Sequence, residues 1–346
     1  MFFASDNSGP VPPQVMAALT TANTGHVMSY GTDALTDAVT DQIRTLFEAP
    51  DASVHLVATG TAANSLALAT LCQPFDTVFC SPVAHIHEDE CNAPEFYTGG
   101  AKLTLVPGDD RMTADALRIA IKGQGNRGVH GPQRGPVSIT QVTEQGNLYS
   151  LTELRALATV AQNYDLPVHL DGARFANACV ALNCTPAEMS WKVGIDVAVF
   201  GGTKNGLMGV EAVIFFNPAH ARAFELRRKR GAHLFSKHRY LAAQMSAYLQ
   251  DDLWRDLATT ANARSAQLLD GLQGLAEIRN DARANMIFAA LPRALHQKAQ
   301  AAGAQYHISG DLNGEDPDGL LTARFVCDWS IDPTDIEAFL DLLGKA

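Results

Sequence analysis

Short apolar runs alternate with helix-periodic stretches from about residue 53 onward. The clearest examples are SVHLV, TAANSLALATL, DTVFC, KLTLVP, TADALRIAIK, PVSIT, LTELRALATVAQNY, LPVHLDG, IDVAVFGG and EAVIFFN. A strand that returns to its sheet through a helix makes a right-handed crossover, so such alternation builds a parallel sheet with helices on both faces. The pattern predicts a large α/β domain with a mainly parallel sheet.

The pattern changes beyond about residue 235. Two long helical stretches, at 238–250 and 252–272, are followed by apolar strands at 285–291 and 320–326 and by a final helix at 332–345. Such a series predicts a smaller α+β domain. We therefore divide the chain into a large domain, 1–245, and a small domain, 246–346, with the N-terminal segment as a candidate to pack on the small domain.

Length and charge narrow the class of partner. The chain has 346 residues, of which 47% are apolar, and this suits about two domains around a sizeable core. The net charge of -11 and the lack of a long basic run argue against nucleic acid or an anionic membrane as the main partner. We expect a small molecule instead.

Cysteine usage and the N-terminal stretch predict a cytoplasmic protein. The six cysteines lie mostly inside apolar segments and form no CxxC pair, as is typical of reduced thiols. The stretch MFFASDNSGP lacks the basic and apolar regions of a signal peptide. No apolar run approaches the ~20 residues of a membrane helix.

Polar residues follow three of the predicted strands, where ligands bind in open α/β sheets. In VATGTAAN, Gly60 and Thr61 end a strand and begin a helix, whose free N–H groups suit a phosphate. Asp171 ends LPVHLD, and a buried carboxylate there needs a cation or a donor. Lys204 follows VAVFGGT, where a desolvated amine could act as a nucleophile.

Each of these features also has an ordinary structural explanation. Gly60 and Thr61 suit a turn and a helix cap, Asp171 suits a cap, and a lysine after two glycines is commonly a solvated loop residue. Together, however, they supply a phosphate site, a partner for a protonated pyridine nitrogen and an amine. These are the groups that pyridoxal phosphate (PLP) requires.

At HLDGARFANA and FGGTKNG the sequence resembles the L-threonine aldolases, which are PLP enzymes of the aspartate-aminotransferase-like fold (fold type I). The likeness extends over nearly the whole chain and includes SDN, YG, TGTAAN, AHIHEDECNAPEF and LLTARFV. The resemblance implies retro-aldol cleavage of L-threonine, L-allo-threonine and related β-hydroxy-α-amino acids to glycine and an aldehyde.

The resemblance also implies roles for particular residues. Lys204 would be the Schiff-base lysine and Asp171 the partner of the pyridine nitrogen, while Gly60 and Thr61 would form part of the phosphate site. His85 would stack on the cofactor ring. Arg174 would lie near both the phenolic oxygen of the cofactor and the substrate carboxylate.

Further residues are implied for the substrate and for proton transfer. Ser5, Tyr30 and Arg324 would help to bind the substrate, with Ser5 and Arg324 on its carboxylate, where a planar guanidinium fits well. The base that takes the β-hydroxyl proton would be His85 first, then His130, or a water held between them.

The sequence departs from the family at two places. Lys229 matches a family lysine that reaches the cofactor phosphate of the partner subunit, but Ser236 stands where an arginine follows, and Lys237 is a candidate substitute. At 141–144 the chain reads Gln-Val-Thr-Glu where many members read Glu-Asn-Thr-His, so no histidine role transfers there. The resemblance still implies a homodimer or homotetramer with sites shared across a two-fold interface.

Other functions compete with this interpretation. The stretch AHIHEDEC offers His85, His87, Asp89 and Glu90 at metal-ligand spacing, as in a metal-dependent hydrolase, although it leaves Lys204 unexplained and we expect no catalytic metal. Within PLP chemistry the alternatives are an aldolase for bulky aromatic substrates such as phenylserine and a β-eliminating lyase. A PLP-binding protein without turnover is a further alternative.

Overall fold

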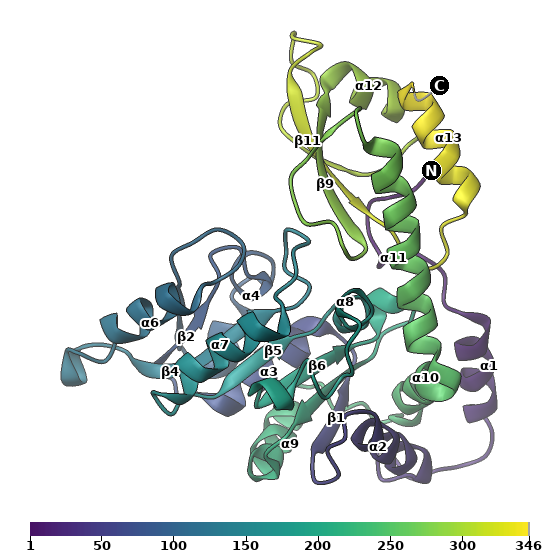
Figure 1. Cartoon of the computed structure of the whole chain (residues 1–346). Coiled ribbons are helices and arrows are strands. Elements are labelled where there is room, and N and C mark those ends of the chain that lie inside the picture. Colours follow the sequence, from purple (N-terminus) through teal and green to yellow (C-terminus); the bar gives the residue numbers. More distant parts are fainter. Residues whose placement is uncertain (345–346) are drawn as a thin grey trace.

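The chain folds into a large and a small body joined by the long helix α11 (Leu253–Leu272), as the computed structural model in Figure 1 shows. The structure describes residues 1–344. The first residues of the chain lie on the small body, and the N-terminal segment runs beside α11 before it enters the large body. Among the described residues, no helix combines the length and the apolar character that a membrane span requires.

A seven-stranded sheet forms the centre of the large body, in the order β1-β7-β6-β5-β4-β2-β3. Its strands are β1 (Ser53–Val57), β2 (Asp76–Cys80), β3 (Lys102–Leu105), β4 (Gln133–Thr140), β5 (Val168–Asp171), β6 (Val197–Gly201) and β7 (Glu211–Phe215). The pairs among β3, β2, β4, β5 and β6 are all parallel. The predicted α/β class with a mainly parallel sheet is confirmed.

Strand β7 is the exception, because it runs antiparallel to both β6 and β1. Parallel strands need a crossover of a dozen or more residues, and only residues 202–210 separate β6 from β7. The chain therefore turns back, and Gly201 pairs with Glu211. This return places Glu211 beside the turn that carries Lys204.

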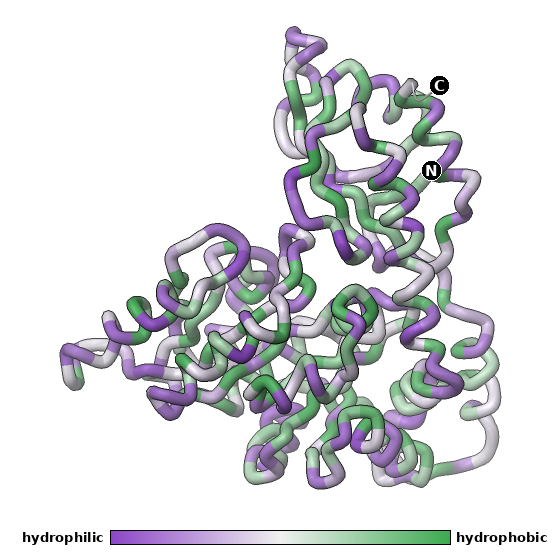
Figure 2. Tube along the Cα trace, in the orientation of Figure 1, coloured by the Kyte–Doolittle hydropathy of each residue, from purple (hydrophilic) through white to green (hydrophobic). Residues whose placement is uncertain are grey.

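Helices cover both faces of the sheet. Val197 and Val199 of β6 pack with α3 (Gly60–Leu71), whereas the alternate residues Ala198 and Phe200 belong to the larger core on the other face. The remaining helices of the large body are α1 (Pro13–Ala22), α2 (Ala34–Leu46), α4 (His85–Glu88), α5 (Ala93–Thr98), α6 (Ala114–Gly123), α7 (Leu151–Gln162), α8 (Phe175–Leu182), α9 (Ala221–Arg230) and α10 (Arg239–Leu249). Figure 2 shows apolar residues concentrated along the central strands.

The small body is an antiparallel sheet covered by helices, in the strand order β10-β11-β9-β8. Its elements are β8 (Glu277–Ile278), β9 (Met286–Pro292), α12 (Arg293–Ala301), β10 (His307–Ser309), β11 (Leu320–Val326) and α13 (Pro333–Leu343). This arrangement confirms the predicted smaller α+β unit. The N-terminal segment extends it, since the Val326 N–H donates to the Phe3 carbonyl at 2.8 Å.

The two cores meet along α11. Trp254 and Leu257 at its start belong to the core of the large body, whereas Leu268 and Leu272 near its end belong to the core of the small body. The helix therefore belongs to both, and the domain boundary after residue 245 stays a prediction.

Replacing Phe3 with alanine should destabilise the protein by about 3–5 kcal/mol, the usual cost of deleting a buried phenylalanine. Phe3 is fully buried, and its ring centroid lies 5.1 Å from that of Phe339 and 6.2 Å from that of Phe325. Urea denaturation would measure the change. The control is Phe2→Ala, since Phe2 is 40% exposed; equal losses for the two variants would contradict the prediction.

Candidate active site

The carboxyl ends of three parallel strands bring the candidate residues together. Asp171 is the last residue of β5, Lys204 lies in the 3-10 turn Thr203–Asn205 that follows β6, and Glu144 follows β4. Parallel strands end at the same edge of a sheet, so these side chains share one region. The charge of Lys204 acts on both Glu144 and Asp6, which places all of these groups in one electrostatic environment.

Two glycines let the Lys204 turn approach the neighbouring backbone closely. A Cβ atom on Gly201 would lie 2.6 Å from the carbonyl oxygens of Gly172 and Ala173. A Cβ atom on Gly202 would lie 2.5 Å from Cδ1 of Leu207. No side chain fits at either position, so both residues of the Gly-Gly pair are required.

Hydrogen bonds on both sides of Lys204 hold its turn. Asn205 Nδ2 donates to the Tyr248 hydroxyl at 2.6 Å and to the Trp254 carbonyl at 2.8 Å. The Gly202 N–H donates to Glu211 Oε2 at 2.8 Å. Burial raises the pKa of Glu211 to about 7, although its hydrogen bonds and the charge of Lys204 oppose the rise. Lys204 therefore extends from a rigid backbone.

Asp171 is a buried carboxylate without a cationic partner. Its Oδ1 accepts the Ala173 N–H at 3.1 Å and its Oδ2 accepts Asn64 Nδ2 at 3.0 Å. No ion pair among the described residues includes it, although it is only 2% exposed. A buried carboxylate normally meets a cation, so this side chain fits a protonated ring nitrogen.

Arg174 is already engaged by another side chain. Its Nε donates to Asp6 Oδ2 at 2.7 Å and its Nη2 donates to Asp6 Oδ1 at 3.1 Å. Burial alone would raise the pKa of Asp6, but Arg174 and Lys204 lower it below its usual range. The edge of the guanidinium formed by Nε and Nη2 is therefore occupied by Asp6. The predicted contact of Arg174 with substrate and cofactor stays a prediction, and Nη1 is the nitrogen that does not face Asp6.

Arg324 on β11 reaches the same region from the small body. Its Nη2 donates to the Ala4 carbonyl at 3.3 Å, whereas its buried Nε has no hydrogen-bond partner among the described residues. Burial and then the charge of Arg174 lower the pKa of Arg324. Ser5 lies next to Ala4, and its hydroxyl accepts the Asn7 N–H at 3.1 Å. An unpaired guanidinium nitrogen beside a serine suits a carboxylate ligand.

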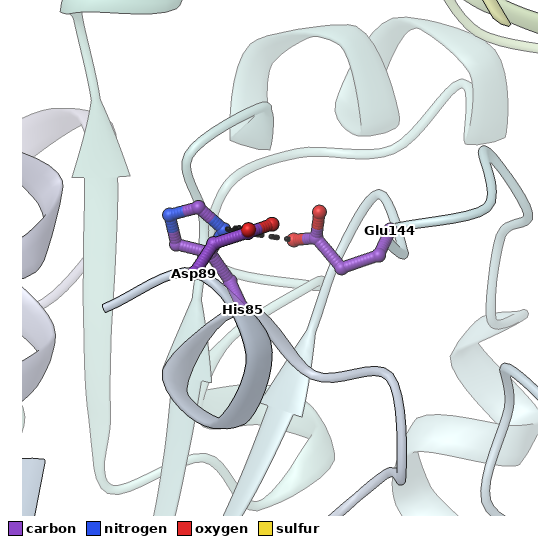
Figure 3. Close-up of side chains that lie close together, drawn as sticks. All are labelled: His85, Asp89 and Glu144. Atoms are coloured by element: carbon purple, nitrogen blue, oxygen red, sulfur yellow. Dashed lines mark ion pairs between the residues drawn. The ribbon is translucent and has the colours of Figure 1, made fainter. Parts of the chain in front are cut away.

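His85 at the start of α4 lies between two carboxylates, as Figure 3 shows. Its Nδ1 is 3.7 Å from Asp89 Oδ2 and 3.7 Å from Glu144 Oε1. Burial raises the pKa of Glu144, and the nearby charges of His85, Arg174 and Lys204 only partly offset this. Both carboxylates face the Nδ1 side, which leaves Nε2 for other contacts.

Only part of the ligand set of the metal interpretation comes together, because His85 and Asp89 form a potential ligand group with Glu144 and not with His87 or Glu90. His87 Nε2 lies 3.3 Å from Glu88 Oε1, and Glu90 is buried against Asn64. Of the four residues in that set, only His85 and Asp89 lie together.

Gly60 and Thr61 lie at the N-terminus of α3 with open space beside them. The side chain of Thr59 caps the helix by accepting the Ala62 N–H at 3.2 Å, which leaves the N–H groups of Gly60 and Thr61 at the helix end. A Cβ atom on Gly60 would meet no atom within 4 Å. This space and these donors fit a phosphate group.

Four residues predicted for the site lie elsewhere in the single chain. Lys229 Nζ is 4.6 Å from the ring centroid of Tyr30, and the Tyr30 N–H donates to the Ser236 carbonyl at 3.0 Å, next to the exposed Lys237. No hydrogen bond, ion pair or cation–π contact among the described residues joins this group to Lys204, and the roles predicted for Lys229 and Lys237 across an interface and for Tyr30 at the substrate stay predictions.

The fourth residue is His130, whose predicted role as a base stays a prediction. His130 is exposed in a 3-10 turn just before β4. That turn lies at the amino end of the strand, whereas Asp171 and Lys204 lie beyond the carboxyl ends of β5 and β6. His130 thus lies before the amino end of its strand, and these two residues lie at the carboxyl ends of theirs.

Asp6, Asn64, Glu90 and Glu211 are contributors to which sequence reasoning assigned no role in the PLP site. Asp6 and Asn64 fall inside the SDN and TGTAAN motifs, which was the available signal. Asp6 meets Arg174, which is 168 positions away in the sequence, and Asn64 meets Asp171, which is 107 positions away. A local sequence pattern does not indicate contacts over such separations.

Comparison with known proteins now adds to this geometry. The family model described as beta-eliminating lyase matches residues 3–292. The chain belongs to the beta-eliminating lyase family. It is 41% identical to a low specificity L-threonine aldolase of Pseudomonas aeruginosa over 345 residues, which cover 98% of this chain and 95% of the relative. A second such aldolase, from another Pseudomonas, is 40% identical over 336 residues, 95% of this chain and 93% of the relative.

Solved structures of other proteins share the fold. The threonine aldolase of Leishmania major superimposes with a TM-score of 0.92 at 24% identity, over 99% of this chain and 98% of that one. The serine palmitoyltransferase of Sphingomonas wittichii gives a TM-score of 0.71 at 16% identity, over 99% and 86%. The resemblance to the L-threonine aldolases and the PLP-dependent fold is confirmed.

Replacing Asp6 with asparagine should destabilise this family member by about 3–5 kcal/mol at neutral pH, because Arg174 would keep a buried charge without its partner. The pKa of Asp6 is lowered in the folded protein, so the pair contributes above the pKa of the unfolded chain and is lost as pH falls through the folded value. The deficit of the variant should therefore shrink in acid.

Urea denaturation at pH 7 and at successively lower pH would measure this deficit. Asp51→Asn is the control, because Asp51 is exposed. A deficit for Asp6→Asn that stays constant down to strongly acidic pH would contradict the assigned ion pair.

Proposed function

We propose that this protein cleaves L-threonine, L-allo-threonine and related β-hydroxy-α-amino acids to glycine and an aldehyde, with PLP as cofactor. One observation carries the proposal. Asp171, a buried carboxylate without a cation, shares the edge of the sheet with Lys204 and with the open helix end at Gly60. The relatives that are 40% and 41% identical over nearly the whole chain are low specificity L-threonine aldolases, which supports the substrate class.

The residues of this edge fit the parts of PLP. Lys204 would hold its carbonyl carbon, Asp171 its ring nitrogen, and the N–H groups of Gly60 and Thr61 its phosphate, with His85 against the ring. When bound, PLP supplies a carbonyl that a lysine amine can hold covalently and a ring that takes up the electron pair released as a carbon–carbon bond breaks.

The substrate carboxylate would lie against Arg324 and Ser5. Arg324 Nε is the buried donor that lacks a partner, so a carboxylate there would satisfy it. Asp6 holds Arg174 in the same region through an ion pair. Arg174 would therefore contribute its positive charge near the substrate carboxylate while it remains paired with Asp6.

His85 is the best-placed group to take the β-hydroxyl proton. Its side chain is 26% exposed, so substrate can reach it, and Asp89 and Glu144 on the Nδ1 side stabilise the charge that a proton on Nε2 would create. His130 is the second candidate for this role.

The assembly we propose is a homodimer or homotetramer in the cytoplasm with shared sites. Lys229, Tyr30 and Lys237 form an exposed group that no described contact joins to the site of their own chain. A partner subunit would bring this group to the cofactor phosphate, with Lys237 in place of the missing arginine and Tyr30 near the substrate.

The family model favours a second candidate, a β-eliminating lyase. An aldolase tuned to bulky aromatic substrates is a variant of the first. A panel of L-threonine, L-allo-threonine, phenylserine and L-serine separates them by product. We expect glycine with an aldehyde; a 2-oxo acid with ammonia would show β-elimination instead.

Lys204→Ala should lose essentially all cleavage of L-threonine and the visible absorption band that PLP develops on binding its lysine, while it remains folded. Circular dichroism would check the fold, and aldehyde release would report turnover. Lys192→Ala is the matched control, since Lys192 pairs with Glu48 at the surface. Turnover near the wild-type rate in Lys204→Ala would refute the role of this lysine.

Shared sites predict complementation between two inactive variants, Lys204→Ala and the double variant Lys229→Ala, Lys237→Ala. Random mixing makes half of the dimers mixed, and in each of these one site carries both defects while the other is intact. Co-refolding should therefore recover about a quarter of wild-type activity. With subunit exchange confirmed by tagged pull-down, activity that stays at the parental level would show that the lysines act within one chain.

A further inference from the structure

One amide nitrogen joins two buried carboxyl groups beside the cofactor site. Asn64 on α3 donates from Nδ2 to Asp171 Oδ2 at 3.0 Å and to Glu90 Oε1 at 2.9 Å. All three side chains are at most 3% exposed. Glu90 comes from the segment between α4 and α5, so this unit connects three separate parts of the chain at Asp171.

Glu90 has the environment of a neutral acid. No cation pairs with it among the described residues, and its second oxygen, Oε2, receives only a 3.5 Å contact from the Ser65 hydroxyl. Burial raises the pKa of Glu90 to about 8, and the negative charges of Asp171 and Glu144 add to this, while hydrogen bonds from Asn64 and Ser65 oppose it. At neutral pH the side chain is mostly protonated.

The orientation of the Asn64 amide decides what Asp171 meets. In the observed orientation, Asn64 Nδ2 faces Asp171 and donates to its carboxylate. If the amide were rotated by half a turn, its oxygen would face the carboxylate instead, and the two would repel each other. The second N–H of Nδ2 needs an acceptor to keep the observed orientation, and Glu90 Oε1 is that acceptor. Asn64 Oδ1 has no partner among the described residues, so it does not hold the orientation from its other side.

We propose that Glu90 is a positioning residue of the cofactor site, which holds the Asn64 amide so that Asp171 faces the ring nitrogen. The inference rests on the proposed function only in that Asp171 is taken as the partner of PLP. Glu90 itself touches neither cofactor nor substrate in this scheme.

A purely structural glutamate would behave differently from a positioning one. Replacing Glu90 with leucine removes a buried acid without a cation but also leaves the second N–H of Asn64 unpaired, so its two effects on the free energy of unfolding oppose each other. The two roles are therefore separated by cofactor affinity: a positioning role predicts that folded Glu90→Leu binds PLP less well, whereas a purely structural role predicts unchanged affinity of the folded protein.

The first experiment measures PLP affinity by titrating cofactor-free protein and following the visible band. Glu90→Leu leaves one buried donor unpaired and should raise the Kd for PLP about tenfold, with kcat reduced and KM little changed. Glu90→Gln restores an acceptor and should bind PLP at least about threefold more tightly than Glu90→Leu. The control is Glu88→Leu, because the Glu88 side chain is 55% exposed on the short helix α4 that ends two residues before Glu90, and we expect wild-type affinity.

The second experiment tests the neutral state by thermal unfolding of cofactor-free protein at pH 5 and pH 8. Native Glu90 keeps its proton up to a pKa of about 8, whereas the unfolded chain releases it near the ordinary value of 4.5. The contribution of Glu90 to the stability of the wild-type protein therefore falls as pH rises between these values, since Glu90 binds its proton more tightly in the native state than in the unfolded chain. Relative to wild type, the Tm of Glu90→Gln should be higher at pH 8 than at pH 5.

The outcomes are distinct. If folded Glu90→Leu binds PLP as tightly as Glu88→Leu, Glu90 is structural and the proposal is wrong. If Glu90→Gln is as weak as Glu90→Leu and its relative Tm does not rise with pH, an ionised carboxylate is required and the neutral acid is refuted. Wild-type protein that binds PLP but cleaves no β-hydroxy amino acid would overturn the proposed reaction and leave this test intact.

Discussion

The buried ion pair between Asp6 and Arg174 joins the parts of the molecule on which the site depends. Asp6 lies on the N-terminal segment that extends the small body, and Arg174 lies between β5 and α8 of the large body. Asn285, just before β9, donates to Asp6 Oδ2 at 3.0 Å. Breaking one partner of such a pair leaves a desolvated charge, so the pair holds these segments in one arrangement. That arrangement brings Arg324 on β11 towards Lys204 after β6.

The site around this ion pair is a set of charges of which most are satisfied within the protein. Asp6 and Arg174 satisfy each other, and Glu211 is held by the backbone of the Lys204 turn. Among the groups without a matching partner are the Asp171 carboxylate, which accepts two hydrogen bonds but meets no cation, and Arg324 Nε, which has no hydrogen-bond partner among the described residues. Buried polar groups in native proteins normally have partners, and these two are the groups that we assign to the ring nitrogen of PLP and to the substrate carboxylate.

Local patterns predicted the elements well but not their relations across the chain. The apolar runs ending at Asp171 and before Lys204 became β5 and β6, because period-two and helical spacing follow directly from backbone geometry. Strand β7 was expected to follow the parallel pattern, yet the short connection 202–210 made it antiparallel. His130 matched a family position in sequence, but the order of its turn and β4 places it at the opposite edge of the sheet in its own chain.

By itself the sequence determined the α/β class, the strand ends that carry Lys204 and Asp171, and the family, because these are read from residues close together or from long motifs. Only the tertiary structure decided which side chains meet. Asp6 pairs with Arg174 across 168 positions, and Asn64, which also donates to Glu90, meets Asp171 across 107 positions. The physical reason is burial: the fold removes these charges and amides from water, so each must find a partner wherever the packing of distant segments provides one.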